Sequence, residues 1–383
     1  MENITKRFGK VTANNAINLE LHEGEILSLL GENGSGKTTL MNMLSGIYFP
    51  DEGKIYVHDK PVTIASPKDA FDLGIGMIHQ HFKLVDLFTA TENIILGLEG
   101  KLDLNNARQK VKDICDKYGF DIDPDMKIYD MSVSQKQTVE IVKVLYRGAD
   151  ILILDEPTAV LTPQETEKLF TVMRNMKKDG KAIIIITHKL HEVLAVSDRV
   201  AVLRKGEYIG DTDTATASQQ SLTDMMVGRA VSLNIDRPLN ENQTERLKVE
   251  HLTVKNKEGV KMLDDVTFTA MGGEILGIAG VEGNGQKELV DMLFGFLTPN
   301  AGSVTVQEEN ILGLPQQKLR SKGISLVPED RMLYGIAASA SIEENLISDR
   351  SAEKRLNHGP LFNMKAIHEE ADRLIEDYTV LCK

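Results

Sequence analysis

The sequence predicts an α/β fold in which a mainly parallel sheet is flanked by helices. Apolar segments of strand length, such as 151–154 and 181–187, alternate with segments of helical periodicity, such as 163–178. Polar residues directly follow several of the apolar segments, and open α/β sheets bind their ligands at this end of their strands. The whole pattern then recurs in the second half of the chain, which predicts a duplicated domain.

Each element can be justified in order from its pattern. Residues 1–30 predict antiparallel strands, because residues 16–21 alternate with period two, and the apolar run 26–30 predicts a buried strand. Residues 91–150 are mostly helical in pattern. The remaining expected elements are short strands at 54–57 and 75–80, the strands and helix at 151–154, 163–178 and 181–187, and a short helix at 222–227.

A glycine-rich stretch separates the strand at 26–30 from a helix that begins near Thr39. It reads Gly31-Glu32-Asn33-Gly34-Ser35-Gly36-Lys37-Thr38-Thr39 and matches the pattern G-x-x-x-x-G-K-[ST]. Its backbone N–H groups and the helix N-terminus are expected to bind phosphate oxygens. Lys37 is expected to reach the β- and γ-phosphates, and Thr38 to offer its hydroxyl to Mg²⁺. The alternative, a glycine-rich turn without a ligand, is disfavoured by the flanking strand and helix.

Four other side chains at strand ends complete the predicted site, together with one aromatic ring. Asp155 follows a buried strand and is expected to hold Mg²⁺, and Glu156 to orient or deprotonate the attacking water. Gln80 is expected to contact Mg²⁺ and the γ-phosphate, His188 the γ-phosphate, and Phe8 a nucleotide base. Taken alone, the Asp155–Thr158 segment could be a helix cap, His188 a structural histidine and Phe8 a core residue, and Gln80 by itself indicates nothing.

Composition narrows the class of protein. A length of 383 residues predicts two or three domains, and a net charge of −13 disfavours non-specific nucleic-acid binding. Cys115 and Cys382 are far apart, which argues against a disulfide framework or a structural zinc site. The N-terminal residues lack the apolar core of a signal peptide, and no apolar run reaches about 18 residues. A role at a membrane would therefore require a partner.

The recurrence fixes the expected domain boundaries. Gly31 recurs as Gly280, an offset of 249 residues (280 − 31), and the same offset relates Gln80 to Glu329. The expected domains are residues 1–231 and 247–383, joined by a linker at 232–246. The second copy is expected to be truncated, because counterparts of Asp155 and His188 would lie beyond residue 383.

These motifs together resemble those of an ABC-type ATPase. In order along the chain they look like its Walker A motif, Q-loop, signature, Walker B motif and H-loop: 31–39, Gln80, Met131-Ser132-Val133-Ser134-Gln135, Asp155-Glu156-Pro157-Thr158 and His188. The tandem copy resembles the fused ATP-binding subunits of bacterial monosaccharide importers. Residues 74–82 and 139–150 are most similar to the nucleoside-import branch.

The resemblance implies a fold, an activity and partners. The fold is a P-loop NTPase with a helical subdomain at about 84–150 and an antiparallel β subdomain, duplicated. Two such ATPase units would pair head to tail, with ATP between one phosphate loop and the signature residues Ser132, Ser134 and Gln135 of the other. ATP hydrolysis would drive integral-membrane permease subunits, which dock near 84–130 and Gln80, and through them a solute-binding protein. The subunit would be peripheral to the cytoplasmic face of the membrane.

The sequence departs from the family pattern at several positions. Ser134 stands where the commonest signature has glycine, and its side chain would crowd the approach of backbone to the γ-phosphate. In the second loop, which includes Gly283 and Gly285, Gln286 replaces the phosphate-binding lysine and Lys287 replaces the Mg²⁺-binding hydroxyl. This second nucleotide site is expected to be weak and non-hydrolytic.

Three readings of function follow. The leading one is an ATP-binding subunit that couples ATP hydrolysis to uptake of a nucleoside or simple sugar. The second is a soluble ABC protein of translation or DNA repair, which the acidic charge and the missing zinc cysteines disfavour. The third is a chain that only binds ATP or partners, so hydrolysis by the chain alone stays open.

Overall fold

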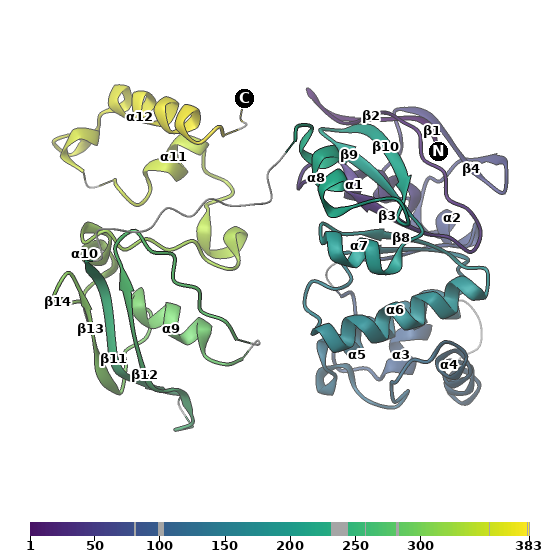
Figure 1. Cartoon of the computed structure of the whole chain (residues 1–383), viewed down its shortest axis with the longest axis horizontal. Helices are drawn as coiled ribbons and strands as arrows, with labels where there is room; N and C mark the ends of the chain where they lie inside the picture. The colour runs from purple at the N-terminus through teal and green to yellow at the C-terminus, as the bar shows by residue number, and fades with distance from the viewer. Residues whose placement is uncertain are drawn as a thin grey trace. The chain divides into compact units, whose positions relative to one another are not determined.

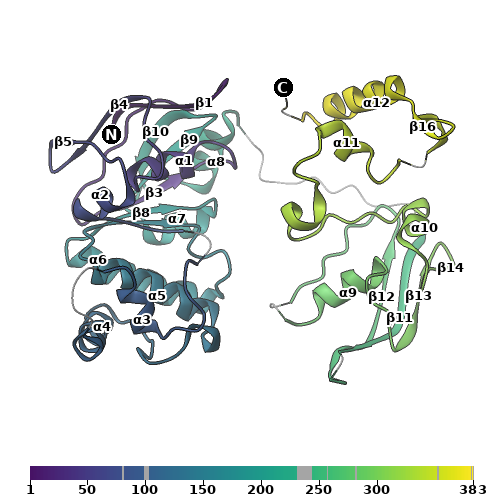
Figure 2. The same cartoon turned by 180° about the vertical axis from the view of Figure 1, so that it is seen from behind.

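The computed structural model describes residues 1–79, 82–98, 103–230, 244–256, 258–280, 283–351, 353–380 and 382. The chain divides into two compact units, Met1–Ile235 and Asp236–Lys383, which are drawn in Figures 1 and 2. Within the described residues, no helix combines the length and the apolar character needed to cross a bilayer.

The first unit is built on a six-stranded sheet in the order β10-β9-β3-β8-β7-β6. The strands are β3 (Ile26–Leu30), β6 (Ile75–Ile78), β7 (Ile151–Asp155), β8 (Ala182–Ile186), β9 (Arg199–Arg204) and β10 (Glu207–Asp213). All pairs are parallel except β9–β10, so the expected parallel sheet is confirmed. The edge strand β10 is antiparallel to its neighbour β9. β3 and β8 are buried along their whole length, as strands covered on both faces should be.

The two faces of this sheet belong to two hydrophobic cores. On β7, Ile153 packs with β3 residues and with α1 (Lys37–Leu44), while Leu152 and Leu154 pack with α6 (Pro163–Lys178). Alternate residues of a strand point to opposite faces, which explains the division. The helix α6 begins at the residue that the sequence predicts, because Thr162 and Glu165 form a capping box and Pro163 occupies the first helical position.

A smaller antiparallel sheet, in the order β2-β1-β4-β5, packs on the α1 side. Its strands are β1 (Glu2–Phe8), β2 (Val11–Ile17), β4 (Glu52–Val57) and β5 (Lys60–Val62). The strand expected at 16–21 was placed too late, because a tight turn at Gly9 pairs Phe8 with Val11 and starts β2 there. Leu19 is buried beyond the end of this strand, which accounts for the misleading alternation.

Helices complete the first unit. The helical part expected at about 84–150 contains α3 (Ala90–Ile95), α4 (Leu104–Tyr118), a 3₁₀ turn η1 (Ile128–Asp130) and α5 (Val133–Tyr146), around a core of its own. The remaining helices are α2 (Pro67–Asp72), α7 (Leu190–Val196) and α8 (Gln219–Val227). α8 extends the short helix expected at 222–227, since Ser218 and Ser221 form a capping box before it.

The second unit repeats the antiparallel sheet of the first. β11 (Glu245–Lys255), β12 (Lys261–Met271), β13 (Ala301–Val306) and β14 (Glu309–Asn310) lie in the order β12-β11-β13-β14. The other elements are α9 (Gln286–Leu293), α10 (Gln316–Ser321), the π-helical turn η2 (Arg331–Gly335), α11 (Ile342–Ile347), the 3₁₀ turn η3 (Lys354–Leu356), the hairpin β15 (Asn357–His358) and β16 (Leu361–Phe362), and α12 (Met364–Asp377).

The counterpart of β3 does not form a strand in the second unit. Residues 274–280 have no regular structure, and Ile275 is 99% exposed where its counterpart Ile26 is fully buried. In the first unit, β3 is hydrogen-bonded between β8 and β9. Among the described residues, 274–280 pair with no strand, so the second loop is not preceded by a sheet strand as the first is.

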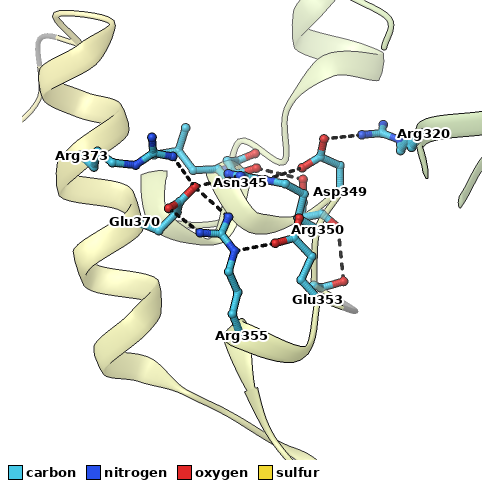
Figure 3. Close-up of polar contacts among 11 residues, drawn as sticks. Arg320, Asn345, Asp349, Arg350, Glu353, Arg355, Glu370 and Arg373 are labelled. Carbon is cyan, nitrogen blue, oxygen red and sulfur yellow. Dashed lines mark hydrogen bonds and ion pairs between the residues drawn. The ribbon is translucent and has the colours of Figure 1, made fainter. Parts of the chain in front are cut away.

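An ion-pair cluster joins the helical elements of the second unit (Figure 3). Glu370 on α12 is 6% exposed and accepts hydrogen bonds from Arg350, Arg355 and Arg373 at 2.8–3.1 Å. These contacts hold the pKa of Glu370 at about 2, well below its usual value. The cluster therefore fastens α12 to the segment between α11 and β15.

Candidate functional site

The loop between β3 and α1 has a backbone that only glycine fits at two positions. Gly31 has φ +158°, and a Cβ there would lie 2.2 Å from the Leu203 carbonyl oxygen. Gly36 has φ +96°, and a Cβ there would lie 2.4 Å from the Ala13 carbonyl oxygen. The loop is thus pressed against β9 and β2, and α1 begins directly after it at Lys37. This is the strand–loop–helix context that phosphate binding requires.

Lys37 folds back over this loop. Its Nζ donates to the carbonyl oxygens of Gly31 at 2.7 Å and Glu32 at 2.9 Å, and the residue is only 7% exposed. Burial lowers the pKa of Lys37, and the nearby carboxylates of Glu156 and Asp155 oppose that shift. The ammonium group is held by neutral carbonyl groups, which a phosphate anion can displace because it offers a stronger, charge-assisted acceptor.

The carboxyl end of β7 brings an acidic side chain to the start of α1. Thr38 Oγ1 donates to Asp155 Oδ2 at 3.4 Å, and Asp155 is 8% exposed. Burial and the neighbouring Glu156 raise the pKa of Asp155, while the Thr38 hydrogen bond and Lys37 lower it. A hydroxyl and a carboxylate therefore meet beside the phosphate loop.

Glu156 has an unusual backbone and a defined partner. Its φ is +50°, its N–H donates to the Ile186 carbonyl at 2.9 Å, and its Oε1 lies 2.8 Å from Nδ1 of His188. His188 comes two residues after the end of β8, so the ends of adjacent strands present this pair. A cavity of about 110 Å³ is lined by Asp155, Glu156 and Gln137 among others, which is room for a few water molecules.

The predicted signature residues cap a helix. Ser132 is the N-cap of α5 and forms a capping box with Gln135, and Ser134 lies in the first turn of the same helix. Within the described residues, no hydrogen bond joins 132–135 to 31–39 of the same unit. The structure thus does not bring the signature residues onto the loop that precedes α1.

The aromatic residue Phe8 lies at the end of β1 and is partly exposed. Its ring packs edge to face on Tyr48, with centroids 5.2 Å apart, and Lys6 Nζ lies 5.6 Å from the Phe8 ring centre. Nothing in the local sequence around Tyr48 predicts this contact. Gln80 falls outside the described residues.

The second loop has the same backbone turns with different chemistry. Gly283 and Gly285 have φ +85° and +95°, close to the values of Gly34 and Gly36. The Gln286 amide lies over Gly280, because an added Cβ on that glycine would be 2.0 Å from Nε2. Lys287 turns to Asp291 at 2.7 Å. In sequence, a neutral amide thus stands at the position that corresponds to Lys37 of the first loop.

Comparisons with known proteins agree with this geometry. The sequence model of the family described as "ABC transporter" matches residues 14–159 and 263–379. The nucleoside import ATP-binding protein NupA of Lactococcus lactis subsp. cremoris is 43% identical over 99% of this chain and 76% of its own length. The guanosine import ATP-binding protein NupO of Bacillus subtilis is 44% identical over 99% and 75%. A ribose import ATP-binding protein of Streptomyces avermitilis is 38% identical over 98% and 71%.

Solved structures show the same fold. An ATP-binding cassette of an ABC transporter in its ADP conformation has a TM-score of 0.53 and 26% identity, and the match covers 60% of this chain and 97% of that cassette. A bacterial ABC transporter cassette solved as a dimer has a TM-score of 0.50 and 26% identity, over 56% and 97%. The duplicated match and these likenesses confirm the predicted fold class, and ATP hydrolysis is the activity of the family. The chain belongs to the ABC transporter family, as an ATP-binding subunit.

Proposed function

We propose that this chain powers the uptake of a nucleoside or simple sugar by binding and hydrolysing ATP at the loop 31–39. The observation that carries the proposal is a continuous set of contacts at the carboxyl edge of the sheet. Lys37 covers the loop, Thr38 hydrogen-bonds Asp155, and Glu156 pairs with His188. Phosphate binding, metal binding and water activation thus have neighbouring groups.

The residues that would hold the triphosphate are those of the phosphate loop. The backbone N–H groups of 31–39, with Asn33, Gly34, Ser35 and Thr39 among them, surround the phosphates, and Lys37 leaves its loop carbonyls to bind the β- and γ-phosphates. The base would stack on the Phe8–Tyr48 pair.

Thr38 and Asp155 fit a magnesium ion. They supply a hydroxyl and a carboxylate oxygen 3.4 Å apart, and Mg²⁺ is commonly held by one or two such groups together with substrate phosphates. The described residues hold no cluster of three or more acidic, histidine or cysteine side chains suited to a metal. When bound, the ion would neutralise charge on the phosphates. Gln80 is proposed as a further ligand, on the resemblance alone.

Glu156 and His188 would carry out the hydrolytic step. The Glu156 carboxylate accepts a proton from the water that attacks the γ-phosphate, and the adjacent cavity gives that water space. His188 orients the carboxylate from its other side and contacts the γ-phosphate.

Our proposals for the pairing of cassettes and for the partner proteins rest on similarity to known proteins. We propose that Ser132, Ser134 and Gln135 cover ATP bound to another cassette, as the dimeric solved cassette supports, and that the second loop with Gly283, Gly285 and Gln286 binds nucleotide weakly without hydrolysis. The names of the relatives, which are import ATP-binding proteins, support membrane permease partners. A position at the cytoplasmic face of the membrane and a solute-binding protein are proposed on the resemblance of the motifs alone. We propose a nucleoside rather than a sugar, because the nucleoside and guanosine importers share 43–44% identity with this chain, and a glucose and a ribose importer share 40% and 38%.

Phosphate release by the purified chain tests the proposal. The unsubstituted chain should release phosphate from ATP in the presence of Mg²⁺, and Glu156→Gln should bind ATP but release none. Glu167→Gln, which removes an exposed carboxylate from α6, is the matched control and should behave as the unsubstituted chain. Equal phosphate release by Glu156→Gln would contradict the role of Glu156.

An uptake assay tests the transport function. In cells that depend on this protein for nucleoside uptake, Lys37→Ala should abolish uptake, and Lys181→Ala, at the opposite edge of the sheet, should not. Unchanged uptake with Lys37→Ala would refute the proposal.

A further inference from the structure

Directly after Glu156, the chain contacts two charged side chains: Lys189, which precedes α7, and Glu192, which lies in its first turn. Thr158 is 1% exposed and Glu192 is 5% exposed. The Thr158 hydroxyl donates to Glu192 Oε2 at 2.5 Å. Lys189 Nζ donates to the Thr158 carbonyl oxygen at 2.8 Å and lies 3.1 Å from Glu192 Oε1. Thr158, Lys189 and Glu192 thus form a closed set of contacts, named here the α7 clamp.

Two residues of the α7 clamp are close in sequence to the Glu156–His188 pair. Thr158 follows Glu156 by two residues, and Lys189 directly follows His188. On the other side of the same loop, Gln137 of α5 donates to the Pro157 carbonyl oxygen at 2.6 Å. Residues 157 and 158 are therefore held by hydrogen bonds from both α5 and the start of α7. They directly follow Glu156, whose backbone is in the left-handed region.

The conformation of Glu156 needs such support. A non-glycine residue at φ +50° persists only when its surroundings hold it there, and residues of this kind cluster at functional sites. Burying the Thr158 hydroxyl and the Glu192 carboxylate, with the partly buried Lys189 ammonium beside them, costs desolvation that an apolar contact between the loop and α7 would not. Packing alone therefore does not account for a polar clamp at this position, whereas directional hydrogen bonds to residue 158 would fix the orientation of the preceding carboxylate.

We propose that Thr158, Lys189 and Glu192 are positioning residues that hold Glu156 opposite His188 for hydrolysis. This inference rests on the proposed function for its catalytic consequence. The geometric consequence is independent of turnover: without the clamp, the hydrogen bond between Glu156 and His188 Nδ1 is lost.

The first test reads that hydrogen bond by NMR on the full chain. A carboxylate partner at Nδ1 favours the neutral tautomer that carries its proton on Nδ1. With ¹⁵N-labelled histidine, and signals assigned by their loss in His188→Gln, the unsubstituted chain should show this tautomer at His188. Thr158→Val, which keeps the shape and removes the hydroxyl, should shift it to the Nε2-protonated form, and Thr158→Ser should restore it.

The second test reads the catalytic consequence. Thr158→Val should lower kcat for phosphate release by about ten- to a hundredfold, as small displacements of catalytic groups do, with KM for ATP unchanged. Thr158→Ser should keep kcat. Glu192→Gln is the second variant, which keeps an acceptor for Thr158 and removes the ion pair to Lys189. It should shift the His188 tautomer toward the Nε2-protonated form and lower kcat, as Thr158→Val does.

The matched control is Glu25→Gln. Glu25 is as buried as Glu192 and pairs with Arg199 at 2.8 Å, but at the start of β3, the opposite edge of the sheet. It should lower thermal stability and leave the His188 tautomer and kcat unchanged. An unchanged tautomer and kcat in Thr158→Val and Glu192→Gln would overturn the inference. A chain that binds no ATP would overturn the proposed function, while the tautomer would still decide the clamp.

Discussion

Gly36 offers a quantitative test of how the phosphate loop is built. At φ +96°, an alanine Cβ would lie 2.4 Å from the Ala13 carbonyl oxygen and 2.6 Å from Asn14 Nδ2. The left-handed backbone costs an L-residue about 1–2 kcal/mol. The contact with backbone, which no rotamer change relieves, adds about 1–3 kcal/mol. Gly36→Ala should therefore destabilise the loop and its neighbours by about 2–5 kcal/mol.

Gly9→Ala separates the two contributions. Gly9 also has a positive φ, +58°, but its Cβ would meet nothing within 4 Å. Gly9→Ala should therefore lower the stability only by the backbone contribution of about 1–2 kcal/mol. The two substitutions are chemically identical and lie in the same unit, so the difference between them reports the close approach of the loop to β2.

Native-state hydrogen exchange of the β3 amides measures both free energies without assuming that the two units unfold together. Titration with a fluorescent ATP analogue measures the consequence for binding. Gly36→Ala should lower the opening free energy of β3 more than Gly9→Ala does, and it alone should weaken nucleotide binding. Equal effects of the two variants on β3, or full nucleotide affinity in Gly36→Ala, would refute the reasoning.

Three further outcomes follow from the described contacts. Because burial lowers the pKa of Lys37, affinity for an ATP analogue should fall as pH rises toward the alkaline range, and Lys37→Arg, which keeps its charge, should lack this fall. Because the pKa of Glu370 is about 2 and its usual value is 4.5, its stabilisation is complete above the higher value and is lost as pH falls through the lower; circular dichroism should show that Glu370→Gln, unlike exposed Glu369→Gln, destabilises α12 at neutral pH by about 1–3 kcal/mol. Burial raises the pKa of Cys115 to about 11, so mass spectrometry should find an alkylating reagent on exposed Cys382 first.

Elements with strong local signals could be predicted from the sequence. The capping box, the N1 proline and the apolar face of α6 all lie within one continuous segment of the sequence. The expected and observed bounds of this helix therefore coincide. The strand β2 was misplaced because its register depends on the turn at Gly9 and on pairing with β1, which alternation within 16–21 does not encode. The parallel sheet was predictable from its apolar runs, but its strand order was not, because order depends on contacts between distant segments.

The residues of the candidate site also differ in how clearly the sequence predicts them. Lys37, Asp155 and Glu156 stand out because each follows or ends a recognisable motif. Tyr48, Gln137 and Glu192 do not, because their roles come from partners far along the chain: Phe8, Pro157 and Thr158. A side chain that acts by holding a loop leaves no pattern in its own neighbourhood, so only three-dimensional contacts reveal it.

The two glycine loops show that a motif and a site are different things. Both loops have the same left-handed glycines before a helix, at Gly36 and Gly285. The first loop follows a buried strand that lies between two others, and an acidic strand end meets the start of its helix at Asp155. In the second, residues 274–280 are not part of a sheet, and an amide replaces the ammonium group. In the first loop, neighbouring strands supply the close approach of the backbone and β7 supplies the carboxylate, and this is the geometry that we propose for phosphate binding and cleavage.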